Sequence, residues 1–301
     1  MIKVRKKRRG ISTIIFMVCM ALPAVSHILI FWLGGNLASF KMAFTDYYTG
    51  KFTFDNFEQA WILFTETKGT GLDFAFANTL KFFLVGLLST FLSMYAAYLL
   101  YKKTVGYRFS RIMLYLPAAV CGLVMARLFN QFGMSDGPLG AIMEKMGIPM
   151  NGSSLMTNPD TALGAIMFFD IWVGLGGSLI FYYAAMNRIP PSLTEYAHLE
   201  GIGPIKEFLT IVLPLIWPTV VTMLTLQITG FFGSSGSVLV FTQGKYETTT
   251  IAYWMYHIVN QGLYSYFHIA NAAGFVFLLL TIPLLIVGRV IMNKFGQEVE
   301  Y

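Results

Sequence analysis

Six apolar stretches in this chain are each long enough to cross a lipid bilayer as a helix. A membrane-spanning helix needs about 20 consecutive, mostly apolar residues. The stretches lie at residues 11–33, 78–101, 111–130, 161–186, 211–232 and 269–291. Only 12% of the 301 residues are charged, against about 25% in soluble domains. The sequence therefore predicts an all-α polytopic membrane protein with six transmembrane helices.

The first stretch, residues 11–33, follows a basic segment, which is also the arrangement of a signal peptide. The apolar part of a signal peptide runs about 7–15 residues, and this stretch is longer. We interpret it as a retained first span. The sixth stretch contains Pro283, which neighbouring helices can accommodate inside a membrane helix.

The basic residues predict which side of the membrane each connection faces, because Lys and Arg are enriched in cytoplasmic segments. With both termini inside, the cytoplasmic segments hold six basic residues at positions 3–9, together with Lys102, Lys103, Arg108, Arg111, Arg188, Lys206, Arg289 and Lys294. The outer loops then hold Lys41, Lys51, Lys68, Lys145 and Lys245. This asymmetry predicts an N-in/C-in orientation. It also explains the net charge of +6 without nucleic-acid binding.

The predicted organisation is one transmembrane domain at residues 11–295, between a basic N-terminus (1–10) and a tail (296–301). The outer loops contain two further predicted helices. One is an amphipathic run from Phe54 to Phe64. The other is an aromatic stretch at residues 253–256, which we expect to lie at the outer membrane interface, where Tyr and Trp are enriched.

The connection between the fourth and fifth spans, residues 187–214, has the pattern of two short helices. Ser192 is predicted to cap the first helix, and Glu195 to complete a capping box. Gly201 is predicted to end it, and Pro204 to begin the second. Three apolar residues would give the first helix an apolar side: Leu193, Ala197 and Leu199. We call residues 192–208 the elbow; such a unit would project from the membrane as a compact knob for a partner.

The same segment resembles the coupling loop of permease subunits of binding-protein-dependent ABC importers. That loop has the pattern Glu-x-Ala-x-x-acid-Gly, followed after a fixed gap by Ile-x-Leu-Pro. The matching residues here are Glu195, Ala197, Glu200, Gly201, Ile211, Leu213 and Pro214. The preceding Ile189-to-Leu193 stretch resembles the carbohydrate branch, including the maltose-type F and G permeases. Tyr196 and His198 depart from the family pattern, which usually has alanine and often arginine at these positions.

The resemblance covers roughly residues 10–295 and includes three weaker matches in the expected order. They are Asn78-Thr79-Leu80 at the second span, Asp170-Ile171-Trp172 in the fourth, and the outer segment Phe241-Thr242-Gln243-Gly244. The resemblance implies the type I ABC-importer permease (MetI-like) fold in the inner membrane of a bacterial cell.

The resemblance also implies the partners and the mechanism. The elbow would dock on a cytoplasmic ATPase dimer, through Glu195, Tyr196, Ala197, His198, Glu200 and Gly201. A second, homologous permease would complete the channel in the lipid bilayer, and an extracytoplasmic solute-binding protein would deliver a sugar or oligosaccharide. The sequence contains no Gly-x-x-x-x-Gly-Lys-Ser/Thr phosphate loop. We therefore expect a transport subunit without enzymatic activity or a bound cofactor, with ATP and Mg used by the partner ATPase.

Residues that could line a substrate path carry hydrogen-bonding groups or aromatic rings, which together suit sugars. They are Asn78, Asp170, Trp172, Gln227, Thr229, Phe231 and Ser234. An ionisable residue within a span, such as Asp170, is a functional candidate by default. The small residues after Gln227 also suit close helix packing.

Other functions remain open at this stage. A permease for glycerol phosphate would favour cationic residues along the path, and Arg127 is the one candidate. An ion-coupled secondary transporter would need buried ionisable groups and broken helices in matched repeats, and the elbow would be unexplained. A membrane-embedded enzyme would need clustered polar catalytic residues. The histidines and the two cysteines, Cys19 and Cys121, show no spacing typical of a metal site or disulfide.

Overall fold

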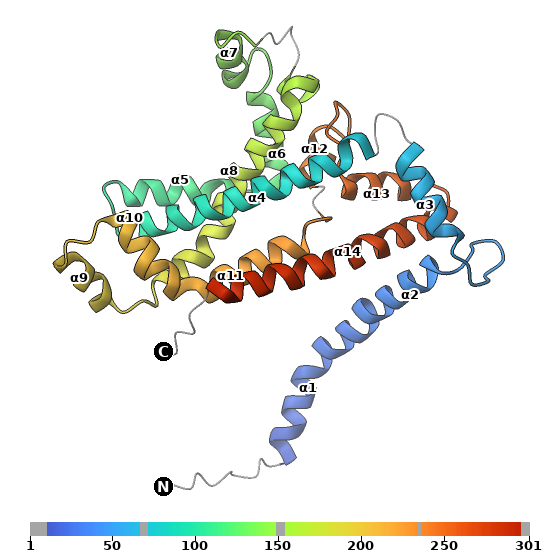
Figure 1. Cartoon of the computed structure of the whole chain (residues 1–301), viewed down its shortest axis with the longest axis horizontal. Coiled ribbons are helices and arrows are strands. Elements are labelled where there is room, and N and C mark those ends of the chain that lie inside the picture. Colours follow the sequence, from blue (N-terminus) through green and yellow to red (C-terminus); the bar gives the residue numbers. More distant parts are fainter. Residues whose placement is uncertain (1–10, 67–71, 149–153, 234–235, 296–301) are drawn as a thin grey trace.

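The computed structural model describes residues 11–66, 72–148, 154–233 and 236–295, and this part of the chain is helical with short connections (Figure 1). Its elements are α1 (Ile11–His27), η1 (Ile28–Leu33), α2 (Gly34–Ala43), α3 (Asp55–Glu66), α4 (Leu72–Tyr101), α5 (Tyr107–Ala119), α6 (Gly122–Phe132), α7 (Pro138–Lys145), η2 (Leu155–Thr157), α8 (Pro159–Met186), α9 (Pro191–Leu199), α10 (Pro204–Glu207), η3 (Phe208–Val212), α11 (Leu213–Thr229), α12 (Gly236–Phe241), α13 (Ile251–Val259) and α14 (Ser265–Phe295). The predicted all-α class is confirmed.

Five of the six predicted spans are continuous helices of sufficient length and hydropathy. They cover Ile15–Ala43, Phe74–Tyr101, Pro159–Met186, Pro204–Thr229 and Ser265–Lys294. Pro283 lies inside α14 without ending it, as predicted.

The predicted third span, residues 111–130, is not one continuous helix, although its two halves together are long and apolar enough to cross a membrane. It is a pair, α5 and α6, bent by 106°. The backbone of Val120 and Cys121 is extended, with ψ of 148° and 128°, so no helical hydrogen bonding passes through this point. Pro117 in the last turn of α5 has no N–H to donate to the preceding turn. The helix therefore ends there and restarts in a new direction.

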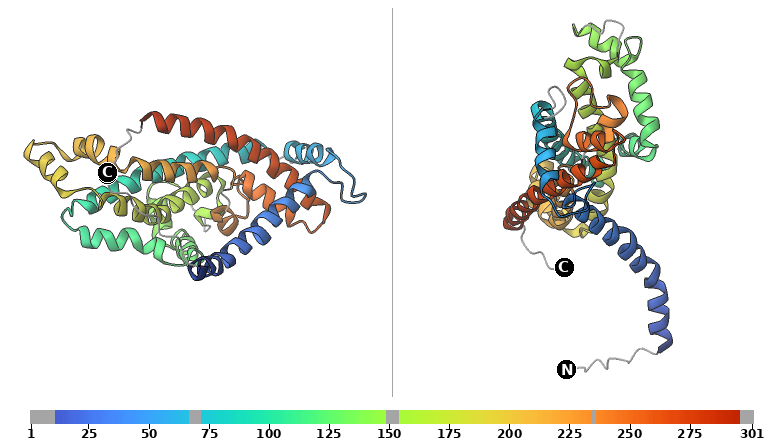
Figure 2. Two further views of the ribbon diagram at one scale, coloured as in Figure 1. Left: turned by 90° about the horizontal axis from the view of Figure 1, so that it is seen from below. Right: turned by 90° about the vertical axis from the view of Figure 1, so that its right-hand side faces the viewer.

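The bundle is built around α4 and α8, with α5 and α11 packed against them and α14 packed against α11 (Figures 1 and 2). At one end of the bundle, Tyr98, Tyr182, Met186 and Val212 form a fully buried cluster. Gly176 lets α5 and α8 approach closely, because a side chain there would meet the backbone of Leu114. Close packing of this kind drives helix association in lipid, where apolar surface alone gives no preference for a protein neighbour.

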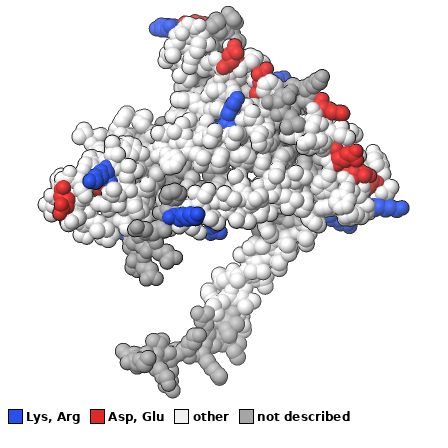
Figure 3. All heavy atoms as spheres, viewed as in Figure 1, with Lys and Arg blue, Asp and Glu red and all other residues white. Residues whose placement is uncertain are grey.

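The rod formed by α1, η1 and α2 projects from the bundle and joins it where α2 packs against α14 (Figure 2). No side chain between residues 15 and 42 is buried. A broad uncharged surface covers much of the molecule in Figure 3. The large apolar side chains that this rod leaves exposed require lipid or a partner around them.

Two predicted helices outside the spans are confirmed as α3 and α13. The role expected for the aromatic residues of α13 needs correction. Tyr253 and Trp254 are only 8% and 4% exposed, and the ring of Trp254 packs 4.9 Å from that of Phe64 in α3. These two residues join helices together, so they do not face a membrane interface.

Candidate functional site

The elbow lies at one end of the bundle, where α9 and α10 turn back on each other (Figure 1). Gly201 has a φ of +66°, a left-handed conformation that glycine adopts without a steric cost. The Ile202 N–H donates to the Ala197 carbonyl at 3.0 Å, and the Gly201 N–H donates to the His198 carbonyl at 3.1 Å. This pair of bonds is the Schellman motif that closes a helix C-terminus. The helix-ending role predicted for Gly201 is confirmed.

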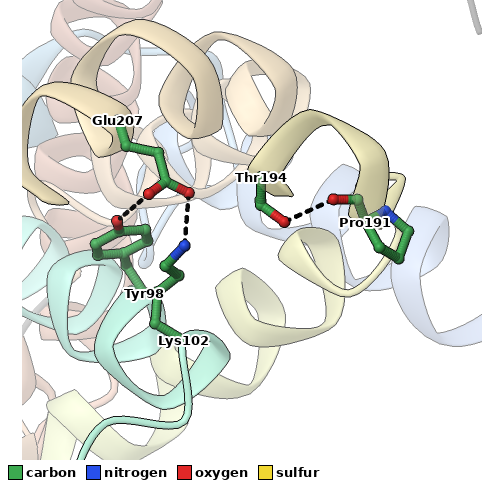
Figure 4. Close-up of polar contacts among 5 residues, drawn as sticks. All are labelled: Tyr98, Lys102, Pro191, Thr194 and Glu207. Carbon is green, nitrogen blue, oxygen red and sulfur yellow. Dashed lines mark hydrogen bonds and ion pairs between the residues drawn. The ribbon is translucent and has the colours of Figure 1, made fainter. Parts of the chain in front are cut away.

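The predicted capping box at the start of the elbow is wrong. The helix begins at Pro191, and no side-chain hydrogen bond caps it. Pro191 is favoured at the first helical position because its φ is already fixed and it has no N–H to satisfy. Ser192 is therefore the second residue of the helix and does not occupy the capping position before it. Inside this first turn, the Thr194 hydroxyl donates to the Pro191 carbonyl at 2.9 Å (Figure 4).

The first helix of the elbow presents most of its side chains outward. Ala197 is fully buried, while Tyr196 is 59% exposed and Leu199 is 86% exposed. The predicted apolar side, which included Leu193 and Leu199, is thus not a buried face. The remaining predicted coupling residues are all exposed: Glu195, His198, Glu200 and Gly201. The knob offers apolar and acidic groups to whatever contacts this end.

The second helix of the elbow is anchored by a buried carboxylate. Glu207 is 3% exposed. One of its oxygens lies 3.0 Å from the Lys102 ammonium, and the other accepts a hydrogen bond from the Tyr98 hydroxyl at 3.2 Å (Figure 4). The adjacent Phe208 ring packs 5.2 Å from the Tyr98 ring. Tyr98 lies in the last turn of α4 and Lys102 directly follows the helix, so these contacts join the elbow to that span.

A small polar cavity of about 200 Å³ lies between α4, α8 and α11. Its lining residues are Phe82, Val85, Gly86, Ser89, Thr90, Asp170, Ile171, Gly174, Ser178 and Gln227. Asp170 also accepts a hydrogen bond from the Ser237 hydroxyl. The structure therefore brings two predicted path residues, Asp170 and Gln227, to one cavity.

The other predicted path residues lie elsewhere. Asn78 is 1% exposed, and its amide donates to the carbonyls of Glu247 and Thr249 at 2.7 Å and 3.0 Å. Phe231 packs against Phe83 with ring centroids 4.9 Å apart. Trp172 packs beside the rings of Phe129 and Phe169. Asn78 thus fastens α4 to a loop, and the two aromatic residues pack between helices.

Two predicted path residues remain. Thr229 is exposed and donates to the Leu226 carbonyl at 2.8 Å. Ser234 lies outside the described residues.

Sequence reasoning missed Glu207 and the cavity hydroxyls. For Glu207 there was a signal, since a carboxylate just before an apolar span is costly unless it has a partner. Ser89 and Thr90 also interrupt an otherwise apolar run, but nothing in the sequence shows that they face Asp170.

The family comparison determines the class of protein. Residues 89–301 match the model of the family described as "Binding-protein-dependent transport system inner membrane component". The chain belongs to this permease family.

Among its relatives, the permease is 31% identical over 194 residues to the sn-glycerol-3-phosphate transport system permease protein UgpA of Escherichia coli O6:K15:H31 (strain 536 / UPEC). This alignment covers 63% of the chain and 65% of that relative. With UgpA of Escherichia coli O157:H7, it is 29% identical over 216 residues, covering 70% and 72%. The chain thus spans about two thirds of the length of these relatives.

A solved structure supports the fold assignment over nearly the whole chain. It is the "bacterial ABC transporter involved in the import of the acidic polysaccharide alginate". The permease superimposes on one of its chains with a TM-score of 0.76 and 22% identity, covering 95% of this chain and 98% of that one. At this identity the likeness establishes the shared MetI-like fold.

Proposed function

We propose that this permease forms one half of the membrane channel of an ATP-driven importer for a sugar or oligosaccharide. A separate ATPase dimer would dock on the elbow and use ATP and Mg. The observation that carries the proposal is the elbow itself: a closed helical knob with exposed Tyr196 and Leu199 that continues directly through η3 into α11. A partner pressing on this knob would move a membrane span.

The positions of the basic residues support an N-in/C-in orientation with the elbow in the cytoplasm. Lys102 contacts Glu207 in the elbow. The Trp217 ring N–H donates to the Met292 carbonyl at 3.0 Å, which brings the end of α14, with Arg289 and Lys294, beside the start of α11. The structure thus gathers several predicted cytoplasmic charges at the elbow's end of the bundle, and Lys and Arg are enriched on that side of membranes.

The incomplete packing of the chain supports a second permease as a partner. No side chain of the rod from Ile15 to Leu33 is buried, and it is α2 that packs against the bundle, on α14. In the proposed assembly, the transmembrane domain at residues 11–295 pairs with a homologous subunit. A solute-binding protein would dock on the outer side. A related structure is described as a complex with an "alginate pentasaccharide-bound periplasmic protein".

The polar cavity supports a substrate rich in hydroxyl groups. Its lining offers the hydroxyls of Ser89, Thr90 and Ser178, the amide of Gln227 and the carboxylate of Asp170. Among the described residues that line it, none is Lys or Arg. A carboxylate repels an anion in a site of low dielectric constant, so a neutral sugar suits this cavity better than an acidic one.

Glycerol phosphate is the second candidate substrate, because UgpA is named for its transport. A phosphate ester would need a cation on its path. Arg127, the candidate from sequence, is exposed on α6 and does not line this cavity. The uptake of glycerol 3-phosphate against that of neutral oligosaccharides separates the two candidates.

Cross-linking of the elbow tests the proposed docking. The complex is purified from its native membrane through a tag on this chain, with Cys19 and Cys121 replaced by serine and a single cysteine introduced as Tyr196→Cys. We expect it to cross-link to a subunit that carries an ATP-binding phosphate loop. Tyr48→Cys, at an 83% exposed tyrosine beyond the opposite end of the bundle, is the matched control. No cross-link at Tyr196, or an equal one at Tyr48, would contradict the proposal.

A further inference from the structure

We propose that the buried cluster of Glu207, Lys102 and Tyr98 is the link through which movement of the elbow displaces α4. The inference rests on the proposed function, and it adds a second output for the elbow. The elbow is joined to α11 by the backbone, whereas only side-chain contacts join it to α4. Glu207 is therefore a positioning residue that couples these two spans.

The geometry makes this link strong and specific. Glu207 uses both of its oxygens, one toward the Lys102 ammonium at 3.0 Å and one toward the Tyr98 hydroxyl at 3.2 Å (Figure 4). The carboxylate side chain is 4% exposed and that of Lys102 is 30% exposed. A charge buried to this degree is costly to leave without its partner. When α10 moves, the end of α4 must follow or the ion pair must break.

The helix that the link would displace, α4, extends from the cluster to the polar cavity. α4 is one uninterrupted helix of 30 residues, and Ser89 and Thr90 on its inner wall precede Tyr98 by about two turns. A helix rises about 1.5 Å per residue, so a displacement at Lys102 reaches the cavity wall over roughly 15–20 Å of rigid helix. α11 carries Gln227 in the same cavity. The elbow is thus joined to two of the three helices that surround the cavity, α4 and α11.

Contacts near the ion pair would preserve the fold if the charge were lost. The Phe208 ring packs 5.2 Å from Tyr98 and 5.7 Å from Tyr95. These apolar contacts would hold α10 near α4 without fixing the distance between them. Loss of the ion pair should therefore loosen the transmission while the elbow still binds its ATPase.

The test follows the cavity wall directly. The tagged complex from the native membrane carries Cys19→Ser, Cys121→Ser and Ser89→Cys, and is reconstituted in lipid vesicles. The rate at which methanethiosulfonate ethylammonium labels Ser89→Cys is compared with and without ATP and vanadate, and ATP hydrolysis is recorded alongside. We expect ATP to change the labelling rate in this parent. If the parent hydrolyses no ATP and shows no such change, the proposed function fails before the link is tested.

Three variants then test the link. Glu207→Gln and Lys102→Met should hydrolyse ATP yet lose the ATP-dependent change in labelling. Lys103→Met, at the exposed neighbouring lysine, should behave as the parent. The exchanged pair Lys102→Glu with Glu207→Lys should restore the change, because it restores the ion pair. An unchanged response in Glu207→Gln would overturn the inference. Two results with the exchanged pair would also overturn the inference. One is assembly without restoration of the ATP-dependent change in labelling, and the other is failure to assemble when the single variants do assemble.

Discussion

The contact of Gly176 with α5 gives a stability prediction with an internal control in the next residue. A Cβ added at Gly176 would lie 2.5 Å from the Leu114 carbonyl oxygen and 2.8 Å from the Ala118 Cβ. Both neighbours are parts of the α5 helix, so neither can rotate away. The next residue, Gly177, has no such atom within 4 Å of an added Cβ. Gly176→Ala and Gly177→Ala therefore differ in one steric contact on the same helix.

The expected magnitude follows from two opposing terms. Each Gly→Ala change in a helix interior gains about 0.8–1 kcal/mol of helix propensity, and this term is the same for both variants. Overpacking at Gly176 costs about 1–3 kcal/mol, because α5 and α8 must separate. Gly176→Ala should thus be less stable than Gly177→Ala by about 1–3 kcal/mol.

The assay is unfolding of the full-length chain in mixed detergent micelles by titration with sodium dodecyl sulfate, followed by circular dichroism. Wild type, Gly176→Ala and Gly177→Ala are compared under one condition. We expect Gly177→Ala to equal or exceed wild type and Gly176→Ala to unfold earlier than Gly177→Ala. Equal stability of the two variants would refute the packing of α5 on α8 described above.

Two further predictions concern a buried amide and the elbow. Asn78→Ala leaves the carbonyls of Glu247 and Thr249 without their donors. It should lower the free energy of unfolding by about 1–3 kcal/mol in the same titration. A loss no larger than that of the exposed variant Thr222→Ala would contradict the described contacts. Gly201→Ala places a side chain in a left-handed conformation, at about 1–2 kcal/mol, and should reduce the ATP hydrolysis of the assembled complex. Gly203→Ala at a φ of −66° should reduce it less, and the reverse order would count against the role of the turn.

Much of the fold follows from local sequence patterns. Apolar runs of about 20 residues are visible directly in the sequence, and a proline such as Pro283 can be assigned to a membrane helix because its neighbours can satisfy the backbone. The break at Val120 and Cys121 is different. Pro117 weakens the end of α5, yet the run from Ile112 to Ala126 contains no charged residue on either side of the break. Hydropathy alone cannot distinguish a straight span from a bent one.

The elbow was predictable to the extent that its geometry is local. Gly201 and Pro204 occupy positions where their own backbone preferences decide the structure. The capping box was misplaced because two patterns overlap, and the proline at position 191 outweighs the serine that follows it. Its exposed surface could not be predicted in detail, since exposure of Leu199 depends on which face of α9 meets the bundle.

The sites built from distant residues were the least predictable. Asn78 looked like a path residue, and its hydrogen-bond partners lie about 170 residues later in the chain. Glu207 was missed because its role depends on an ion pair with Lys102, which lies 105 residues earlier in the chain. Asp170 and Gln227 were selected for their polarity within apolar runs, and the fold brings them together. The sequence can thus indicate which polar residues are candidates for a site, whereas the packing of the helices determines which residues they contact.

ATP-dependent uptake tests the central claim most directly. The complex purified through this chain is reconstituted in vesicles with ATP inside, and the solute-binding protein is added outside with isotope-labelled neutral oligosaccharides or glycerol 3-phosphate. The proposed function predicts oligosaccharide uptake that requires both ATP and the binding protein, and that persists when proton and sodium gradients are abolished. Uptake that proceeds without ATP and stops when an ion gradient is removed would contradict it.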